Sequence, residues 1–193
     1  SGHNTKDGWH VDDILITTAT DTIYSLPFSD NAQNTTRWIT EGTWGLTSSN
    51  PYEGIASFSD SPSGNYIANT DSSLELDGQI DLRSATSPEL AYYNRYDLSS
   101  ADSIQVEVST DNGKIWATLF QKQGSKQSDW TQQKIDLTDY KGQLIRLRFR
   151  LSAKSNQTAE GWDIDAILMG EKTHAINNEP RVVLAGFFSS PPQ

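Results

Sequence analysis

Short stretches of alternating apolar and polar residues, separated by turn-forming residues, are the feature that most limits how this chain can fold. In "SIQVEVS", Ile104, Val106 and Val108 alternate with polar residues, so a strand here would turn one face to a core and the other to water. Similar stretches recur along the chain, each bounded by Gly, Pro, Asn, Asp or Ser, and no window shows a long helical period. The pattern predicts an all-β fold, an antiparallel sandwich of two sheets.

The stretch "LIRLRFRL" shows the same alternation with one irregularity. We expect its apolar face to consist of Leu144, Leu147, Phe149 and Leu151, with the arginines pointing outward. Because these positions do not all share one phase, we expect a β-bulge around Ile145.

A five-residue segment near the start of the chain, "GWHVD" at residues 8–12, is similar to the segment "GWDID" at residues 161–165 near its end. Self-similarity at a distance is typical of repeat arrays. We therefore expect residues 1–19 to be the closing strand of a preceding repeat plus a linker, 20–172 to be one domain, and 173–193 to be a linker into a following domain.

Charge and composition exclude several classes of function. The 193 residues carry a formal net charge of −10, which would repel nucleic acid and anionic membranes. The chain has no cysteine, so disulfides, thiolate metal sites and cysteine nucleophiles are excluded. No apolar run is long enough to span a bilayer, so we expect no membrane insertion.

The segment "STDNGKIW" matches the Asp-box pattern S-x-D-x-G-x-x-W through Ser109, Asp111, Gly113 and Trp116. Sialidases carry several such boxes, but a single copy is more simply a hairpin. We expect Asp111 to accept hydrogen bonds from amides of its own turn, and Asn112 and Gly113 to adopt positive φ angles.

Four segments taken together resemble a known family. "FSDSPSGNY", "LAYYNRYDL" with the Asp-box hairpin, "WTQQKIDLTDYKGQLIRLRFRL" and "GWDIDAILM" are similar in kind and order to the MAM-like jelly-roll domain of immune inhibitor A-type secreted bacterial metallopeptidases. The resemblance implies a MAM/concanavalin-like jelly roll, an extracellular setting and a structural calcium ion. The chain departs from the MAM pattern in having no cysteine, and the peptidase motif H-E-x-x-H is absent.

The resemblance also implies ligands for calcium. They fall on Asp30, Asp60 and Asp165, with Asp71 in reserve. Calcium prefers six to eight oxygen ligands, which carboxylates and turn carbonyls can supply. Without the resemblance, the capping of turns is the better explanation of Asp60 and Asp71.

Aromatic residues offer a second candidate site, a platform on which sugar rings could stack. Its members would be Trp38, Trp44, Tyr52, Trp130 and the pair Tyr92 and Tyr93. Packing in the core is the alternative for each of them, and we expect Trp116 and Trp162 to be buried.

The sequence predicts no catalytic residue. The three histidines, His3, His10 and His174, are isolated in the sequence. The spacing of the carboxylates does not identify any pair as the acid and base of a glycosidase. We expect a non-catalytic extracellular module of a larger protein, in contact with neighbouring domains of the same chain, that binds carbohydrate or a cell-surface protein. The alternatives are an accessory domain of a secreted metallopeptidase and a purely structural spacer.

Overall fold

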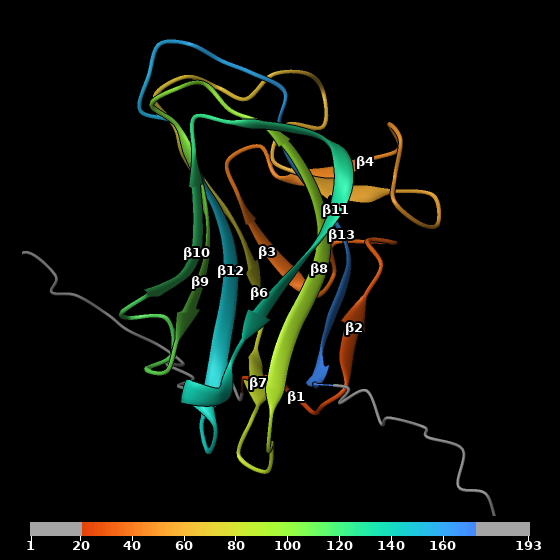
Figure 1. The fold of residues 1–193 in the computed structure, drawn as a ribbon, viewed down its shortest axis with the longest axis vertical. Helices are drawn as coiled ribbons and strands as arrows, with labels where there is room; N and C mark the ends of the chain where they lie inside the picture. The colour runs from red at the N-terminus through yellow and green to blue at the C-terminus, as the bar shows by residue number, and fades with distance from the viewer. Residues whose placement is uncertain (1–20, 173–193) are drawn as a thin grey trace, which may run out of the picture.

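The computed structural model describes residues 21–172, which form two β-sheets packed face to face. Figure 1 shows β6, β9, β10 and β12 on one side of the molecule and β8, β11 and β13 on the other. The prediction of an all-β, two-sheet jelly-roll sandwich is confirmed. Apart from strands, the described residues contain one short 3-10 helix, Thr138–Tyr140, and none of their helices is long and apolar enough to cross a bilayer.

The first sheet has seven strands, and all its pairings are antiparallel except the one between β1 and β7. Its central strand β12 pairs with β9 on one side and with β6 and β7 on the other. The strands are β1 Ile23–Tyr24, β3 Trp38–Glu41, β6 Asp71–Leu76, β7 Gln79–Asp81, β9 Ser103–Ser109, β10 Ala117–Gln123 and β12 Leu144–Ser152.

The second sheet has six strands and carries the site discussed below. Its central strand β13 pairs with β8 on one side and with β2 and β5 on the other, and β11 forms the edge beyond β8. The strands are β2 Phe28–Asp30, β4 Gly45–Thr47, β5 Ser57–Ser59, β8 Pro88–Asp97, β11 Lys126–Asp136 and β13 Gly161–Glu171.

Trp162 lies at the centre of the core between the sheets and is fully buried, as predicted. Its ring packs edge-on against Phe149 at 5.6 Å, Trp44 at 6.0 Å and Tyr92 at 6.4 Å between centroids. Its indole N–H donates to the Oδ1 atom of Asn94 at 3.2 Å, so the polar atom of this large side chain is satisfied inside the core.

Strand β12 alternates without interruption, so the predicted bulge near Ile145 is wrong. Ile145, not Leu144, begins the inward row that continues through every second residue to Leu151. The three arginines between them point outward, as expected, and pair with acidic residues of the neighbouring strands: Arg146 with Glu75, Arg148 with Glu107 and Arg150 with Asp71.

Trp116 is only half-buried, so its predicted place in the core is wrong. The ring covers the guanidinium of Arg148 on the outer face of the first sheet, with 4.2 Å between that group and the ring centroid. The turn before it forms as predicted: Asp111 accepts from the amides of Lys114 and Ile115 at 3.1 and 2.9 Å. Asn112 and Gly113 have φ angles of 61° and 84°.

The expected repeat fragment at residues 1–19 and the expected linker at 173–193 lie outside the described residues. The boundaries of the predicted domain therefore stay predictions.

The two tryptophans predict different losses of stability. Trp162→Ala should lower the free energy of unfolding by about 3–5 kcal/mol, because it removes a fully buried ring and leaves Asn94 without its donor. Trp116→Ala should cost about 1 kcal/mol, the usual scale of an exposed cation–π contact. Urea melts of both variants measure the difference, and equal losses would contradict this account of the core.

Candidate functional site

The outer face of the second sheet is built from the outward residues of β8. Leu90, Tyr92 and Asn94 point into the core and are buried, so Tyr93 and Arg95 between them point outward. The sequence places an aromatic ring and a cation on this face by alternation alone.

A β-bulge in β13 shapes the same face. Asp165 pairs with Tyr93 but Leu168 pairs with Ala91, so β13 has one extra residue between these two pairings. The bulge contains Ala166, with a φ of 48°. As a result Leu168 points outward and is 48% exposed.

The loop between β4 and β5, residues 48–56, folds over this face because side chains from three strands hold it. Asp165 of β13 accepts from the backbone amides of Tyr52 and Glu53 at 3.0 and 3.1 Å. Arg95 of β8 donates to the carbonyl of Ser49 at 3.0 Å. The indole of Trp130 on β11 donates to the carbonyl of Asn50, also at 3.0 Å. The loop is thus fixed to the sheet through its backbone.

An aromatic cluster joins the loop to the sheet. Tyr52 stacks on Tyr93, with 3.6 Å between ring centroids and 13° between ring planes. Trp130 meets Tyr52 edge-on at 6.1 Å, and the guanidinium of Arg95 lies 5.4 Å from the ring centroid of Trp130. Of the predicted platform, the structure therefore brings together Tyr52, Trp130 and Tyr93.

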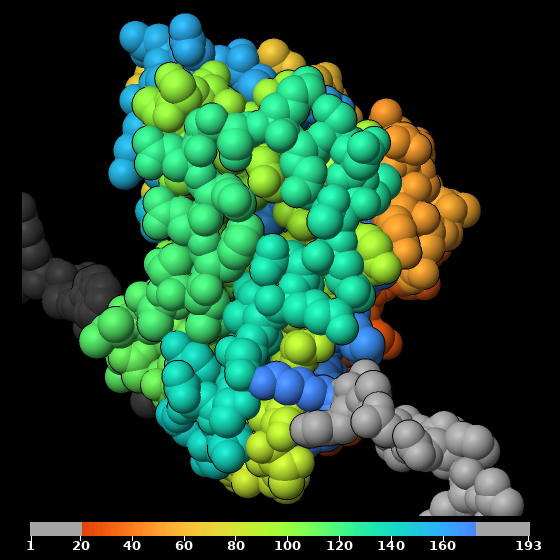
Figure 2. Space-filling view, viewed as in Figure 1, coloured from red at the N-terminus to blue at the C-terminus, as the bar shows by residue number. Residues whose placement is uncertain are grey.

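A groove of about 480 Å³ lies beside this cluster. Its size falls within the range of small-ligand sites, roughly 300–1,000 Å³. In Figure 2 the orange atoms, which include the loop, project from the right side of the molecule beside the green-cyan atoms that include β11. The residues that line the groove include Tyr52, Glu53, Tyr93, Gln132 and Leu168.

Trp38 and Trp44 do not belong to this platform, and their prediction as ligand-binding residues is wrong. They are 6% and 5% exposed and lie in the core. Trp38 packs against Phe58 at 5.4 Å and donates from its indole to Asp30. Both residues come from a polar segment of the sequence whose other residues are mostly exposed: in β3, Trp38 is buried while the three residues after it are exposed.

The four predicted calcium ligands do not gather around one point. Within residues 21–172, no three histidine, aspartate or glutamate side chains are grouped so that they could hold a metal ion. Asp30 accepts from Ala32 and Trp38, Asp165 holds the loop, and Asp71 pairs with Arg150 on the other sheet. The predicted donor set does not fit a shared ion, and calcium stays a prediction from the resemblance alone.

Asp60 is the most unusual of the four. Its Oδ1 atom accepts from the backbone amide of Trp162 at 2.5 Å, while its Oδ2 atom is buried with no hydrogen-bond partner in the described part of the chain. Burial raises the pKa of this carboxyl from 3.8 to about 7, with the nearby carboxylate of Asp163 acting in the same direction. The side chain is thus protonated at mildly acidic pH.

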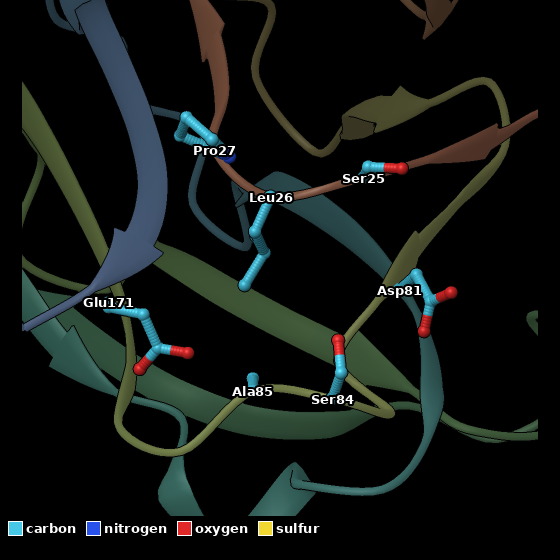
Figure 3. Close-up of a pocket in the computed structure, with 7 residues that line it drawn as sticks. All are labelled: Ser25, Leu26, Pro27, Asp81, Ser84, Ala85 and Glu171. Atoms are coloured by element: carbon cyan, nitrogen blue, oxygen red, sulfur yellow. The ribbon is translucent and has the colours of Figure 1, made fainter.

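A second hollow, of about 460 Å³, lies near the C-terminal end of β13, beside the segment that leads into β2 (Figure 3). Leu26 points into it, and Asp81 and Glu171 lie at opposite sides. Both carboxylates are already used: Asp81 pairs with Arg83, and Glu171 accepts from the amides of Thr86 and Ser87. Because this hollow has no aromatic ring in its lining and both of its carboxylates already have partners, we place the candidate site at the groove.

Comparison with protein families relates most of the sandwich to a known family. The model described as Reelin subrepeat B matches residues 69–170, which is more than half of the chain. Bacillopeptidase F of Bacillus subtilis (strain 168) is 29% identical over 145 residues, which cover 70% of this chain and 10% of that protein. The chain therefore spans about a tenth of this relative.

Solved structures share the fold at low sequence identity. The K1 cleaved adhesin domain of Lys-gingipain from Porphyromonas gingivalis W83 superposes with a TM-score of 0.56 at 16% identity, covering 76% of this chain and 98% of that one. The C-terminal family 22 carbohydrate-binding module of Clostridium thermocellum Xyn10B superposes with a TM-score of 0.50 at 9% identity, covering 75% and 92%. At these identities the likeness shows the fold alone.

Sequence reasoning missed Leu168, Gln132 and Glu53 as groove residues. The sequence could have indicated the position of Leu168. The buried residues Ile164 and Ile167 of "WDIDAILM" are three positions apart, not two, and this break in the alternation indicates a bulge. Gln132 and Glu53 carry none, since nothing in the sequence shows that the loop at 48–56 lies over β8 and β11.

The hydrogen bonds to Asp165 predict how the loop responds to mutation. Asp165→Ala removes the acceptor for the backbone amides of Tyr52 and Glu53 in the loop, so these two amides should exchange with deuterium at least tenfold faster. Asp71→Ala is the control, because its exposed ion pair with Arg150 contributes little. Unchanged exchange in Asp165→Ala would contradict the anchoring role.

The raised pKa of Asp60 predicts a pH dependence of stability. Between pH 3.8 and about 7 the folded protein keeps a proton that the unfolded chain has released, so the free energy of unfolding falls as pH rises through this window. Asp60→Asn keeps an acceptor for the amide of Trp162 but cannot ionise, so this variant should lose less stability between pH 4.5 and pH 8 than the unmodified protein.

Urea melts at the two pH values test this, with the exposed Asp139→Asn as the control. Parallel pH profiles for Asp60→Asn and the unmodified protein would show that Asp60 does not titrate in this range.

Proposed function

The chain belongs to the Reelin subrepeat B family, and on that premise we propose that it is a non-catalytic module that binds carbohydrate in the groove beside Tyr52. The proposal places the module outside the cell as part of a longer protein. The match to a tenth of Bacillopeptidase F supports the second point.

The observation that carries the proposal is the aromatic cluster at the wall of the groove. Tyr52 is 40% exposed and Tyr93 lies beneath it, and both line the cavity. Sugar rings have apolar C–H faces that pack on aromatic rings, and tyrosine offers such a surface at low cost in conformational entropy. Leu168, 48% exposed, extends the apolar surface.

Polar side chains of the groove could form hydrogen bonds with the hydroxyl groups of a sugar. The side-chain amides of Gln132 and Asn31 line it, and within residues 21–172 neither makes a hydrogen bond. An amide both donates and accepts, which matches the hydroxyl groups of a sugar.

The outer face of the other sheet is unsuited to the same role. Its arginines Arg146, Arg148 and Arg150 are each paired with a carboxylate, so the charged groups there satisfy one another. The comparison with a family 22 carbohydrate-binding module supports the proposal at the level of fold.

An accessory role in a peptidase is the second candidate. The 29% identity to Bacillopeptidase F favours it, because that protein is a peptidase by name and the matched part is a tenth of it. The two roles are compatible, since a glycan-binding module could hold such an enzyme at its site of action.

Tyr52→Ala should weaken glycan binding about tenfold or more, because it removes the exposed ring of the stack. The measurement is isothermal titration with a panel of xylo-, cello-, galacto- and manno-oligosaccharides. Ile115→Ala is the control: Ile115 is 74% exposed and lies in the turn after β9, in the other sheet. Absence of binding to the whole panel, or equal affinity in Tyr52→Ala, would refute the proposed function.

A further inference from the structure

We infer that the groove binds uncharged glycans more tightly than acidic ones such as polyuronates. This inference rests on the proposed function and narrows its ligand class. It follows from the charges that line the groove, from the partners of the cations around it, and from the position of Glu53.

The ionisable side chains that line the groove are acidic. Asp30 and Glu53 line it, and no lysine or arginine among the described residues does. Recognition of a carboxylate or sulfate commonly relies on an arginine or lysine that can form charge-assisted hydrogen bonds. The groove offers an anionic ligand no such group.

The cations closest to this region are already paired. Arg37 lies 3.9 Å from Asp30 and donates to the carbonyl of Ser29 at 3.0 Å. Lys134, opposite Ala91 in the sheet, lies 3.7 Å from Glu89. Each of these two cations thus lies beside a carboxylate rather than in the lining of the groove.

Arg95 also has partners already. It is bound to Asp163 at 2.7 Å and holds the loop at Ser49. Releasing it to meet an anionic ligand would leave the buried carboxylate of Asp163 without its partner, which is costly.

Glu53, by contrast, carries a charge that nothing in the described chain neutralises. Its side chain is exposed and has no ion-pair partner within residues 21–172. Its position is fixed, because its backbone amide donates to the buried carboxylate of Asp165 at 3.1 Å. The loop therefore holds a negative charge at the wall of the groove.

The expected size of the effect is modest and depends on salt. One like charge about 4 Å from Glu53 in a water-like medium lowers affinity roughly fivefold. Several uronates along a polymer add to this, and the Debye length of about 8 Å at physiological salt limits the sum. The effect should shrink at high ionic strength.

The experiment compares each acidic polymer with its own carboxyl-reduced form, in which every uronate has become an uncharged hexose of the same linkage. Polygalacturonate, glucuronoxylan and hyaluronate are each used in both forms, alongside the neutral panel. Affinity electrophoresis at low and high salt measures binding. The variants are Glu53→Gln and, as a matched control far from the groove, Asp139→Asn.

We expect the reduced forms to bind at least about fivefold more tightly than the acidic forms, with the difference smaller in Glu53→Gln and at high salt but unchanged in Asp139→Asn. Equal or tighter binding of the acidic forms, or a preference that Glu53→Gln leaves intact, overturns the inference while the proposed function stands. If neither the reduced forms nor the neutral panel binds, the proposed function fails and the inference fails with it.

Discussion

A buried carboxylate must find hydrogen-bond donors, and for Asp165 the donors are the backbone amides of Tyr52 and Glu53. This interaction joins the central strand of the second sheet to a loop more than 100 residues earlier in the chain. It brings Tyr52 onto Tyr93 and sets the charge of Glu53 at the groove. Together with Arg95 and Trp130, this acidic residue holds the loop of the candidate site, although it touches no ligand in the proposed function.

Two further buried carboxylates also need hydrogen-bond donors: Asp163 in β13 and Asp60 directly after β5. Asp163 is paired with Arg95, which in turn binds the loop at Ser49. Asp60 has a donor for only one of its oxygens, and burial raises its pKa to about 7. The second sheet and the turn after β5 thus hold three buried acidic groups, which differ in how many hydrogen-bond donors they have found. Of the acidic residues predicted as metal ligands, Asp30, Asp60 and Asp165 accept hydrogen bonds from backbone amides.

Alternation predicts the fold well, because the side chains of a strand have a strict period of two. The inward row of Ile104, Val106 and Val108 could be read directly from the sequence. The site could be predicted only in part: Tyr52 and Trp130, both predicted for the platform, do contact each other, but Trp38 is buried although most of the segment around it is polar. The partners of a carboxylate lie far away in sequence, so spacing alone could not show them.

If the groove binds glycan as proposed, the ligand lies on one outer face of the sandwich, and the other outer face is occupied by its own ion pairs. Mapping backbone amide shifts by ¹H–¹⁵N NMR during titration with a neutral oligosaccharide tests this placement most directly. The account predicts that the largest shifts fall in the loop at residues 48–56, around Tyr93 and in the bulge of β13. Largest shifts around Arg148, or in the hollow at Leu26, would contradict it.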